Sequence, residues 1–117
     1  NLLRMPRTAL TITDVTRAGV TQPSQQNGDN ANGNSLAYND GKIILEVNNT
    51  SGGALNCTIG IPGTIDSVST AGKVVSVGAG ATTYIGPFPP ALYNQSDGTV
   101  NVDVTASTMK FRVYHLT

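Results

Sequence analysis

Short runs that alternate between apolar and polar side chains, separated by glycine-rich turns, constrain the fold of this chain more than any other feature. The runs TALTITDV, KIILEV, ALNCTIGI, TVNVDV and MKFRVYHL all show the alternation. A period of two places successive side chains on opposite faces of a strand. No stretch keeps apolar residues at helical spacing over three turns. The pattern predicts an all-β protein, an antiparallel β-sandwich (jelly-roll-like) of seven to eight short strands.

The alternation also predicts which side chains face the core. The inward positions are those that share one face of each predicted strand. They are Ile43, Leu45, Val47, Leu55, Cys57, Ile59, Ile61, Val100, Val102, Val104, Met109, Phe111 and Val113.

The first 39 residues differ in character from the rest of the chain. Residues 19–39 are rich in Gln, Asn, Gly and Ser, which predicts a polar linker or loop. We therefore expect residues 1–18 to form an extended N-terminal arm with one strand, and residues 40–117 to form the β-sandwich domain. The arm would add its strand to the sheet of a neighbouring subunit, or lie on the surface of a partner assembly, rather than complete its own core. Met5-Pro6-Arg7 resembles a translation start, so we expect Asn1 to Arg4 to be upstream residues.

The composition limits the classes of partner. Among 117 residues, seven basic and seven acidic side chains cancel, and only 12% of residues are charged. Nucleic-acid binding needs a basic face to displace counterions from phosphates, so we expect no nucleic-acid partner. No apolar run approaches the ~18 residues of a membrane span, so we expect no membrane partner. A neutral, polar surface favours a protein that packs against neighbouring subunits.

Residue patterns for catalysis or metal binding are absent from the sequence. Cys57 and His115 are each the single residue of their type, and Cys57 falls on a predicted core face. The stretch NGDNANGN (27–34) has one carboxylate, Asp29, and no closing acid, so we interpret it as a polar turn rather than a calcium loop. We expect a protein that is not an enzyme and has no cofactor and no metal site.

The connector GPFPPALYNQSDGTV (86–100) concentrates prolines and aromatic residues between two predicted strands. Prolines hold the chain extended and lower the entropy cost of docking. We expect Phe88 to point inward as a cap on the core. Pro89, Pro90 and Tyr93 would then face a partner, although a loop that serves only as a core lid remains an alternative.

Several motifs resemble those of short structural proteins of tailed bacteriophages, of the head decoration (cement) type. The matching residues lie between about 36 and 105 and include Asn39-Asp40-Gly41, Ala79-Gly80, Ile85-Gly86-Pro87-Phe88-Pro89, Tyr93-Asn94 and Asp97-Gly98-Thr99-Val100. The resemblance implies a virion component on the capsid surface, made in the host cytoplasm, that binds and stabilises the head. Its partners would be the major capsid protein and copies of itself, as a trimer or a lattice. No catalytic residues come with the resemblance.

Two other functions stay open at this stage. One is a neck, tail or fibre component of the virion. The other is a carbohydrate-binding adhesion module, although the chain has no Trp and its four tyrosines, at 38, 84, 93 and 114, form no short-range cluster. The residues that we expect to bind a partner are Arg4, Arg7, Leu10, Ile12, Arg17, Pro89, Pro90 and Tyr93.

Overall fold

The computed structural model describes residues 6–62, 64–65, 68–69 and 72–116. The strands are β1 (Thr8–Leu10), β2 (Ile12–Val15), β3 (Gln26–Asn27), β4 (Asn34–Leu36), β5 (Ile43–Asn49), β6 (Leu55–Ile59), β7 (Thr64–Ile65), β8 (Val68–Ser69), β9 (Lys73–Val77), β10 (Thr82–Ile85), β11 (Val100–Val104) and β12 (Met109–Leu116). A short helix, α1 (Pro90–Tyr93), lies between β10 and β11. The prediction of an all-β protein is confirmed.

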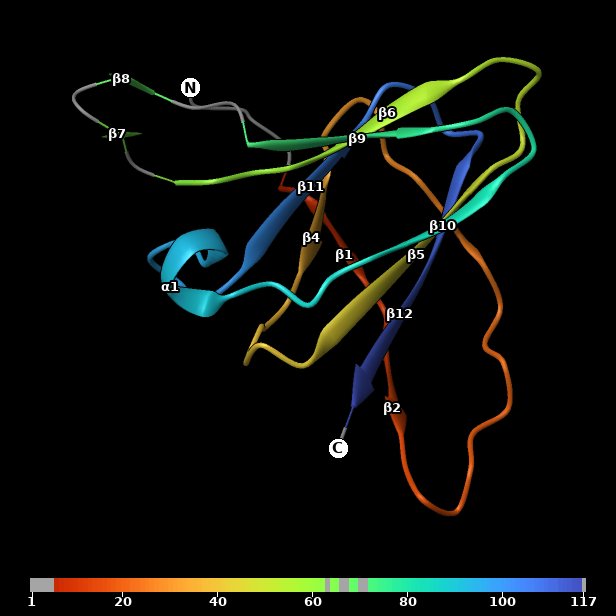
Figure 1. Ribbon diagram of the computed structural model, residues 1–117, viewed down its shortest axis with the longest axis horizontal. Helices are drawn as coiled ribbons and strands as arrows, with labels where there is room; N and C mark the ends of the chain where they lie inside the picture. Colours follow the sequence, from red (N-terminus) through yellow and green to blue (C-terminus); the bar gives the residue numbers. More distant parts are fainter. Residues whose placement is uncertain (1–5, 63, 66–67, 70–71, 117) are drawn as a thin grey trace.

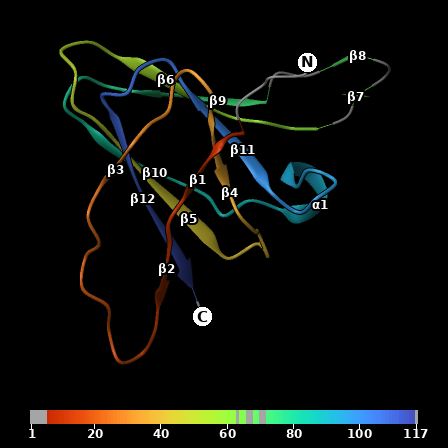
Figure 2. The same cartoon turned by 180° about the vertical axis from the view of Figure 1, so that it is seen from behind.

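The strands form two main sheets, which are followed in Figures 1 and 2. Sheet A has the order β1-β4-β11-β6-β9. Sheet B has the order β10-β5-β12-β2, and β3 also pairs with β12. A separate two-stranded sheet contains β7 and β8. The loop of residues 16–25, drawn in orange, and α1 project at opposite sides of the molecule in both views.

The core lies between the two sheets, where the side chains at the predicted inward positions pack against one another. β5, β11 and β12 alternate between buried and less buried side chains for most of their length. The buried apolar side chains include Ile43, Leu45, Val47, Cys57, Ile59, Val100, Val102, Val104, Met109, Phe111 and Val113, all at most 7% exposed. These members of the predicted core are confirmed, whereas Leu55 is only partly buried against the cluster and Ile61 is half-buried.

One buried asparagine connects the two sheets through polar contacts. Asn49, fully buried on β5 of sheet B, donates from Nδ2 to the Val77 carbonyl on β9 of sheet A at 2.9 Å. The same nitrogen donates to the Gly53 carbonyl at 2.8 Å, and the Ser51 backbone nitrogen donates to Asn49 Oδ1 at 3.0 Å. A buried amide that is satisfied in this way avoids the penalty of an unpaired polar group.

The expectation of a separate N-terminal arm is wrong for residues 8–15. β1 pairs in parallel with β4 in sheet A, and β2 pairs in parallel with β12 in sheet B. Leu10 is 3% exposed in the core, and Ile12 packs against it. The chain crosses from one sheet to the other at Thr11, whose backbone nitrogen donates to Gln26 Oε1 at 2.9 Å. The two sheets are therefore mixed rather than purely antiparallel.

The predicted linker of residues 19–39 also belongs in part to the sandwich. β4 lies between β1 and β11, and both Asn34 and Leu36 are fully buried. A domain boundary at residue 40 is therefore wrong, because β4 supplies an interior strand of sheet A. The strand count exceeds the predicted seven to eight because the N-terminal strands and several two-residue strands are included.

Substitution of Leu10 tests whether residues 8–15 belong to the protein's own core. Leu10→Ala should lower the free energy of unfolding by about 2–4 kcal/mol, because a buried leucine leaves a cavity. Arg17→Ala, at an exposed position, is the matched control and should change it by less than about 0.5 kcal/mol. Chemical denaturation at two protein concentrations gives the measurement. An unchanged stability for Leu10→Ala at both protein concentrations would contradict the self-contained sandwich.

Candidate interaction surface

The connector between β10 and β11 is anchored by Phe88. The Phe88 side chain is 2% exposed and belongs to the core, so its predicted inward orientation is confirmed. Tyr93 packs against it edge-on, with ring centroids 5.5 Å apart and ring planes at 67°. Tyr93 is half-buried because one part of its ring packs against the core, and its contact with a partner stays a prediction.

Two asparagines fix the backbone of this connector. Asn39 Nδ2 donates to the Phe88 carbonyl at 3.0 Å and to Asn94 Oδ1 at 2.8 Å. Asn94 Nδ2 donates in return to the Asn39 carbonyl at 3.1 Å. Asn39 is 7% exposed, so these bonds are largely shielded from water. The asparagines of two separate sequence motifs thus form one clamp.

Gly86 opens the connector where it passes close to β5. Its φ is +133°, and a Cβ at this position would lie 2.6 Å from the Ile43 carbonyl oxygen. Only glycine fits this close approach without displacing backbone. We call residues 86–94 the docking loop. Its outer surface consists of exposed Pro89 and Pro90 with Leu92, which is 44% exposed.

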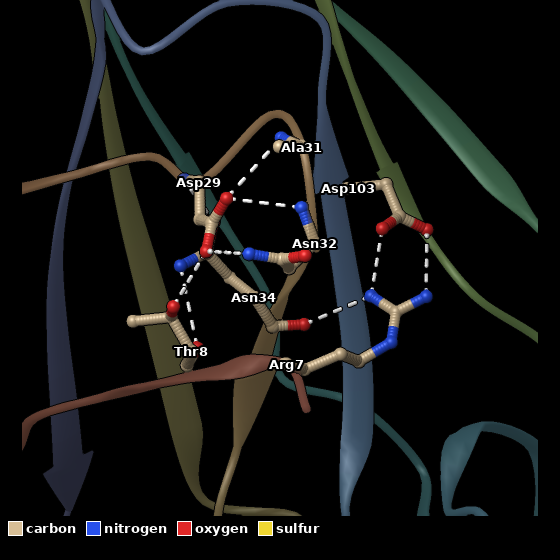
Figure 3. A network of polar contacts seen from close by, with 7 residues as sticks. All are labelled: Arg7, Thr8, Asp29, Ala31, Asn32, Asn34 and Asp103. Atoms are coloured by element: carbon tan, nitrogen blue, oxygen red, sulfur yellow. Dashed lines mark hydrogen bonds and ion pairs between the residues drawn. The ribbon is translucent and has the colours of Figure 1, made fainter. Parts of the chain in front are cut away.

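Three of the N-terminal residues predicted to bind a partner, Arg7, Leu10 and Ile12, contribute to the fold of the chain itself. Arg7 Nη1 lies 2.7 Å from Asp103 Oδ1 and donates to the Asn34 carbonyl at 3.1 Å (Figure 3). Leu10 and Ile12 contribute to the core, as described above. Arg17 is exposed, and Arg4 lies outside the described residues. The predicted partner residues therefore do not form one surface.

Asp29 organises the polar turn that the sequence predicts at residues 27–34. Its Oδ1 accepts from the backbone nitrogens of Ala31 and Asn32 at 3.2 and 3.0 Å (Figure 3). Its Oδ2 accepts from the Thr8 hydroxyl at 2.6 Å, and this bond is the main reason that the pKa of Asp29 is lowered. The carboxylate is occupied by donors from the turn and β1, so the interpretation as a polar turn is confirmed.

Sequence reasoning missed a group of polar and aromatic side chains on the outer face of sheet B. Tyr84 on β10 lies opposite Glu46 on β5, which lies opposite Arg112 on β12. Tyr114 is two residues beyond Arg112 on the same face of β12. We call these four residues the tyrosine face. The alternation predicts that Glu46, Arg112 and Tyr114 point outward, but the pairing register that joins them is not visible in the sequence.

A nearly buried ion pair lies at the centre of the tyrosine face. Arg112 Nη1 is 2.5 Å from Glu46 Oε2, and the side chains are 18% and 3% exposed. Arg112 Nε also donates to the Pro23 carbonyl at 2.7 Å. The hydrogen bond to Glu46 is the largest cause of the raised pKa of Tyr84, whereas the raised pKa of Tyr114 comes first from burial and then from the charge of Glu46.

His115 joins three segments at the edge of sheet B. Its Nδ1 is 3.0 Å from Asp14 Oδ1 on β2, and its Nε2 is 2.8 Å from Asp40 Oδ2 in the turn before β5. The Tyr38 ring packs edge-on against the imidazole at 5.5 Å. The hydrogen bond to Asp40 is the main cause of the raised pKa of His115, and it also lowers the pKa of Asp40. We call these side chains the histidine clasp.

The structure offers neither a reactive cysteine nor a metal-binding group among the residues that it describes. Cys57 is buried in the core, where desolvation raises its pKa to about 12, so the thiolate nucleophile is strongly disfavoured. In the part of the chain that the structure describes, no group of three or more His, Cys, Asp or Glu side chains could hold a metal ion. Within those same residues, no helix has the length and apolar character to span a bilayer.

Comparisons with known proteins give no relative for this chain. No protein-family model, curated protein or solved structure matches it.

Truncation of the docking-loop aromatics should separate the anchor from the exposed surface. Phe88→Ala should cost about 3–5 kcal/mol of stability, as a buried aromatic does. Tyr93→Ala should cost about 1–2 kcal/mol through the lost ring contact. Leu92 is exposed and lies between these two residues in the sequence. Leu92→Ala should therefore change the free energy of unfolding by less than about 0.5 kcal/mol. Thermal and chemical denaturation of the three variants give the comparison, and equal losses for Leu92→Ala and Phe88→Ala would refute the assigned orientation.

The histidine clasp should make stability depend on pH. Folding raises the pKa of His115 above 6.5, so its contribution is complete below that pH and is lost as pH rises through the folded-state pKa. Folding lowers the pKa of Asp40 below 3.8, so the contribution of Asp40 is present above that pH and is lost under stronger acid. The clasp is therefore most stabilising between these two values. Unfolding free energies at about pH 5.5 and about pH 9 should show a loss on the alkaline side that His115→Gln reduces. The same loss in parent and variant would rule the clasp out as its source.

Proposed function

We propose that this protein is a non-enzymatic structural protein of a virion, of the capsid decoration type, which binds the assembled head and stabilises it. Its partners are the major capsid protein and further copies of itself, and it acts on the capsid surface. The observation that carries the proposal is the docking loop. The motif residues Asn39, Phe88 and Asn94, which resemble those of phage head proteins, meet in space and hold an exposed apolar surface in a fixed position.

The physical properties of the docking loop suit a binding role. Proline-rich backbone that is already clamped loses little conformational entropy when it docks. Pro89, Pro90 and Leu92 offer apolar area that becomes favourable once a partner removes it from water. On a capsid, many copies multiply such a modest contact, and neighbouring copies raise one another's effective concentration.

The proposed mechanism is stabilisation by mass action. A protein that binds the mature shell, but not its immature precursor or its free subunits, shifts the equilibrium towards the mature shell. The broader features of the chain support a coat of this kind: a compact all-β body, a net charge of zero and few charged side chains. A position in the neck or tail would use the same contacts with a different symmetry.

The docking loop should be tested with a charge at Leu92, an exposed large apolar side chain on its outer surface. Leu92→Asp should weaken binding to mature capsids by about tenfold or more, because a carboxylate would be desolvated at the interface. Val20→Asp is the matched control, because Val20 is 43% exposed and Leu92 is 44% exposed. Cosedimentation with capsids assembled from the major capsid protein proposed as the partner gives the affinity.

Two outcomes would count against the proposal. Absence of capsid binding by the parent protein would overturn the decoration role, and equal binding by parent and Leu92→Asp would overturn the assignment of the loop. The copy number on intact particles distinguishes the position: a head coat approaches the abundance of the major capsid protein, whereas a neck ring has far fewer copies.

A further inference from the structure

A shallow hollow of about 400 Å³ lies on the outer face of sheet B, beside the tyrosine face. The two tyrosines, Glu46 and several aliphatic side chains form its lining. The lining includes Val20, Gln22, Ile44, Glu46, Tyr84 and Tyr114. None of the residues that line this hollow belongs to the docking loop, and the hollow has no part in the proposed function.

Tyr84 is the most prominent feature of the hollow. Its side chain is 63% exposed, the highest value among the exposed large apolar side chains that the structure describes. It lies on β10, an edge strand of sheet B, directly opposite Glu46. An aromatic ring left this open on the surface is available to stack against a ligand.

Both tyrosines are held in place by the same buried carboxylate. The Tyr114 hydroxyl donates to Glu46 Oε1 at 3.4 Å, and the Tyr84 hydroxyl also bonds to Glu46. Glu46 in turn is fixed by Arg112, as described above. A ring tethered at its hydroxyl end is restricted before binding, so a ligand that stacks on it pays a smaller entropy cost.

The charges of the hollow favour a neutral ligand. Arg112 neutralises Glu46 at 2.5 Å, so the site offers no unbalanced charge to attract an anion or a cation. The Glu46 side chain is only 3% exposed, so its carboxylate holds the two tyrosine hydroxyls in place rather than facing the ligand. Gln22 at the rim adds an amide that both donates and accepts.

The hollow combines apolar area with hydrogen-bonding groups, and its size is comparable to that of one sugar ring. The face of an aromatic ring is electron-rich and attracts the slightly positive C–H bonds of an apolar ligand face. A pyranose has such a C–H face together with hydroxyls around its edge. We propose that the hollow beside the tyrosine face binds a neutral pyranose sugar, with the ring stacked on Tyr84 and its hydroxyls towards Gln22.

The surroundings of the hollow favour a sugar over a second protein chain. A stable protein interface buries about 800 Å² on each partner. On the same face of sheet B, the neighbouring rung across β10, β5 and β12 has Thr82, Asn48 and Lys110, which are polar. The apolar area is therefore confined to the hollow, and it is too small to support a dimer alone.

The test is a titration of the ¹⁵N-labelled full chain with methyl glycosides of glucose, galactose and mannose and with N-acetylglucosamine, followed by amide chemical shifts. We expect saturable shifts in β5, β10 and β12 for at least one neutral sugar. Tyr84→Ala should raise its Kd by about tenfold or more, and Tyr84→Phe should retain most of the affinity because the stacking ring remains. N-acetylneuraminic acid, a charged sugar, should bind more weakly.

Tyr38→Ala is the matched control, because Tyr38 is 44% exposed but packs on His115 outside the hollow. Its Kd should equal that of the parent. Absence of saturable shifts with every neutral sugar, or equal affinity for Tyr84→Ala and the parent, would overturn the proposal. Loss of self-association in Tyr84→Ala without any sugar binding would also overturn it. Capsid binding by Tyr84→Ala should be unchanged, which keeps this result separate from the role of the docking loop.

Discussion

The pairing of β5 with β12 is the constraint on which the rest of the structure depends. Seven consecutive residue pairs join the two strands, from Met109 opposite Asn49 to His115 opposite Ile43. Because side chains alternate, this one register sends one set of residues into the core and the other set to the outer face. A slip by one residue would bury Arg112 and Tyr114 in place of Phe111 and Val113. The cost of burying unpaired polar groups therefore specifies the register strongly.

Each functional feature is attached to this strand pair. The ion pair of Glu46 and Arg112 is a direct cross-strand pair, and it fixes the tyrosines beside it. The histidine clasp lies at the other end of the same ladder, where β12 meets β2. The docking loop follows β10, which pairs with β5 on the side away from β12. A single sheet thus positions the docking loop, an ion pair and a titratable cluster.

The sequence could predict which side chains of a single strand point inward, but not which side chains of different strands come together. Alternation identified the inward positions of β5, β11 and β12, because burial follows the period of two. It failed for TALTITDV, because the alternation continues through Thr11 while the chain passes from one sheet to the other. It also failed for the tyrosine face, because Tyr84 and Tyr114 come together only through the register of three strands. Phe88 was predictable because an aromatic ring beside prolines in a connector has few places other than the core.

The parallel pairing of β2 with β12 has a consequence for the order in which the chain folds. Asp14 and His115 face each other in this pair but are 101 residues apart in sequence. During synthesis, β2 leaves the ribosome before β12, its partner in sheet B. The edge of β2 therefore stays unpaired while the strands between them form. Contacts of such long range slow folding and leave strand edges exposed to other chains. Nascent chains that have not yet released β12 from the ribosome are therefore the species that most needs chaperone protection.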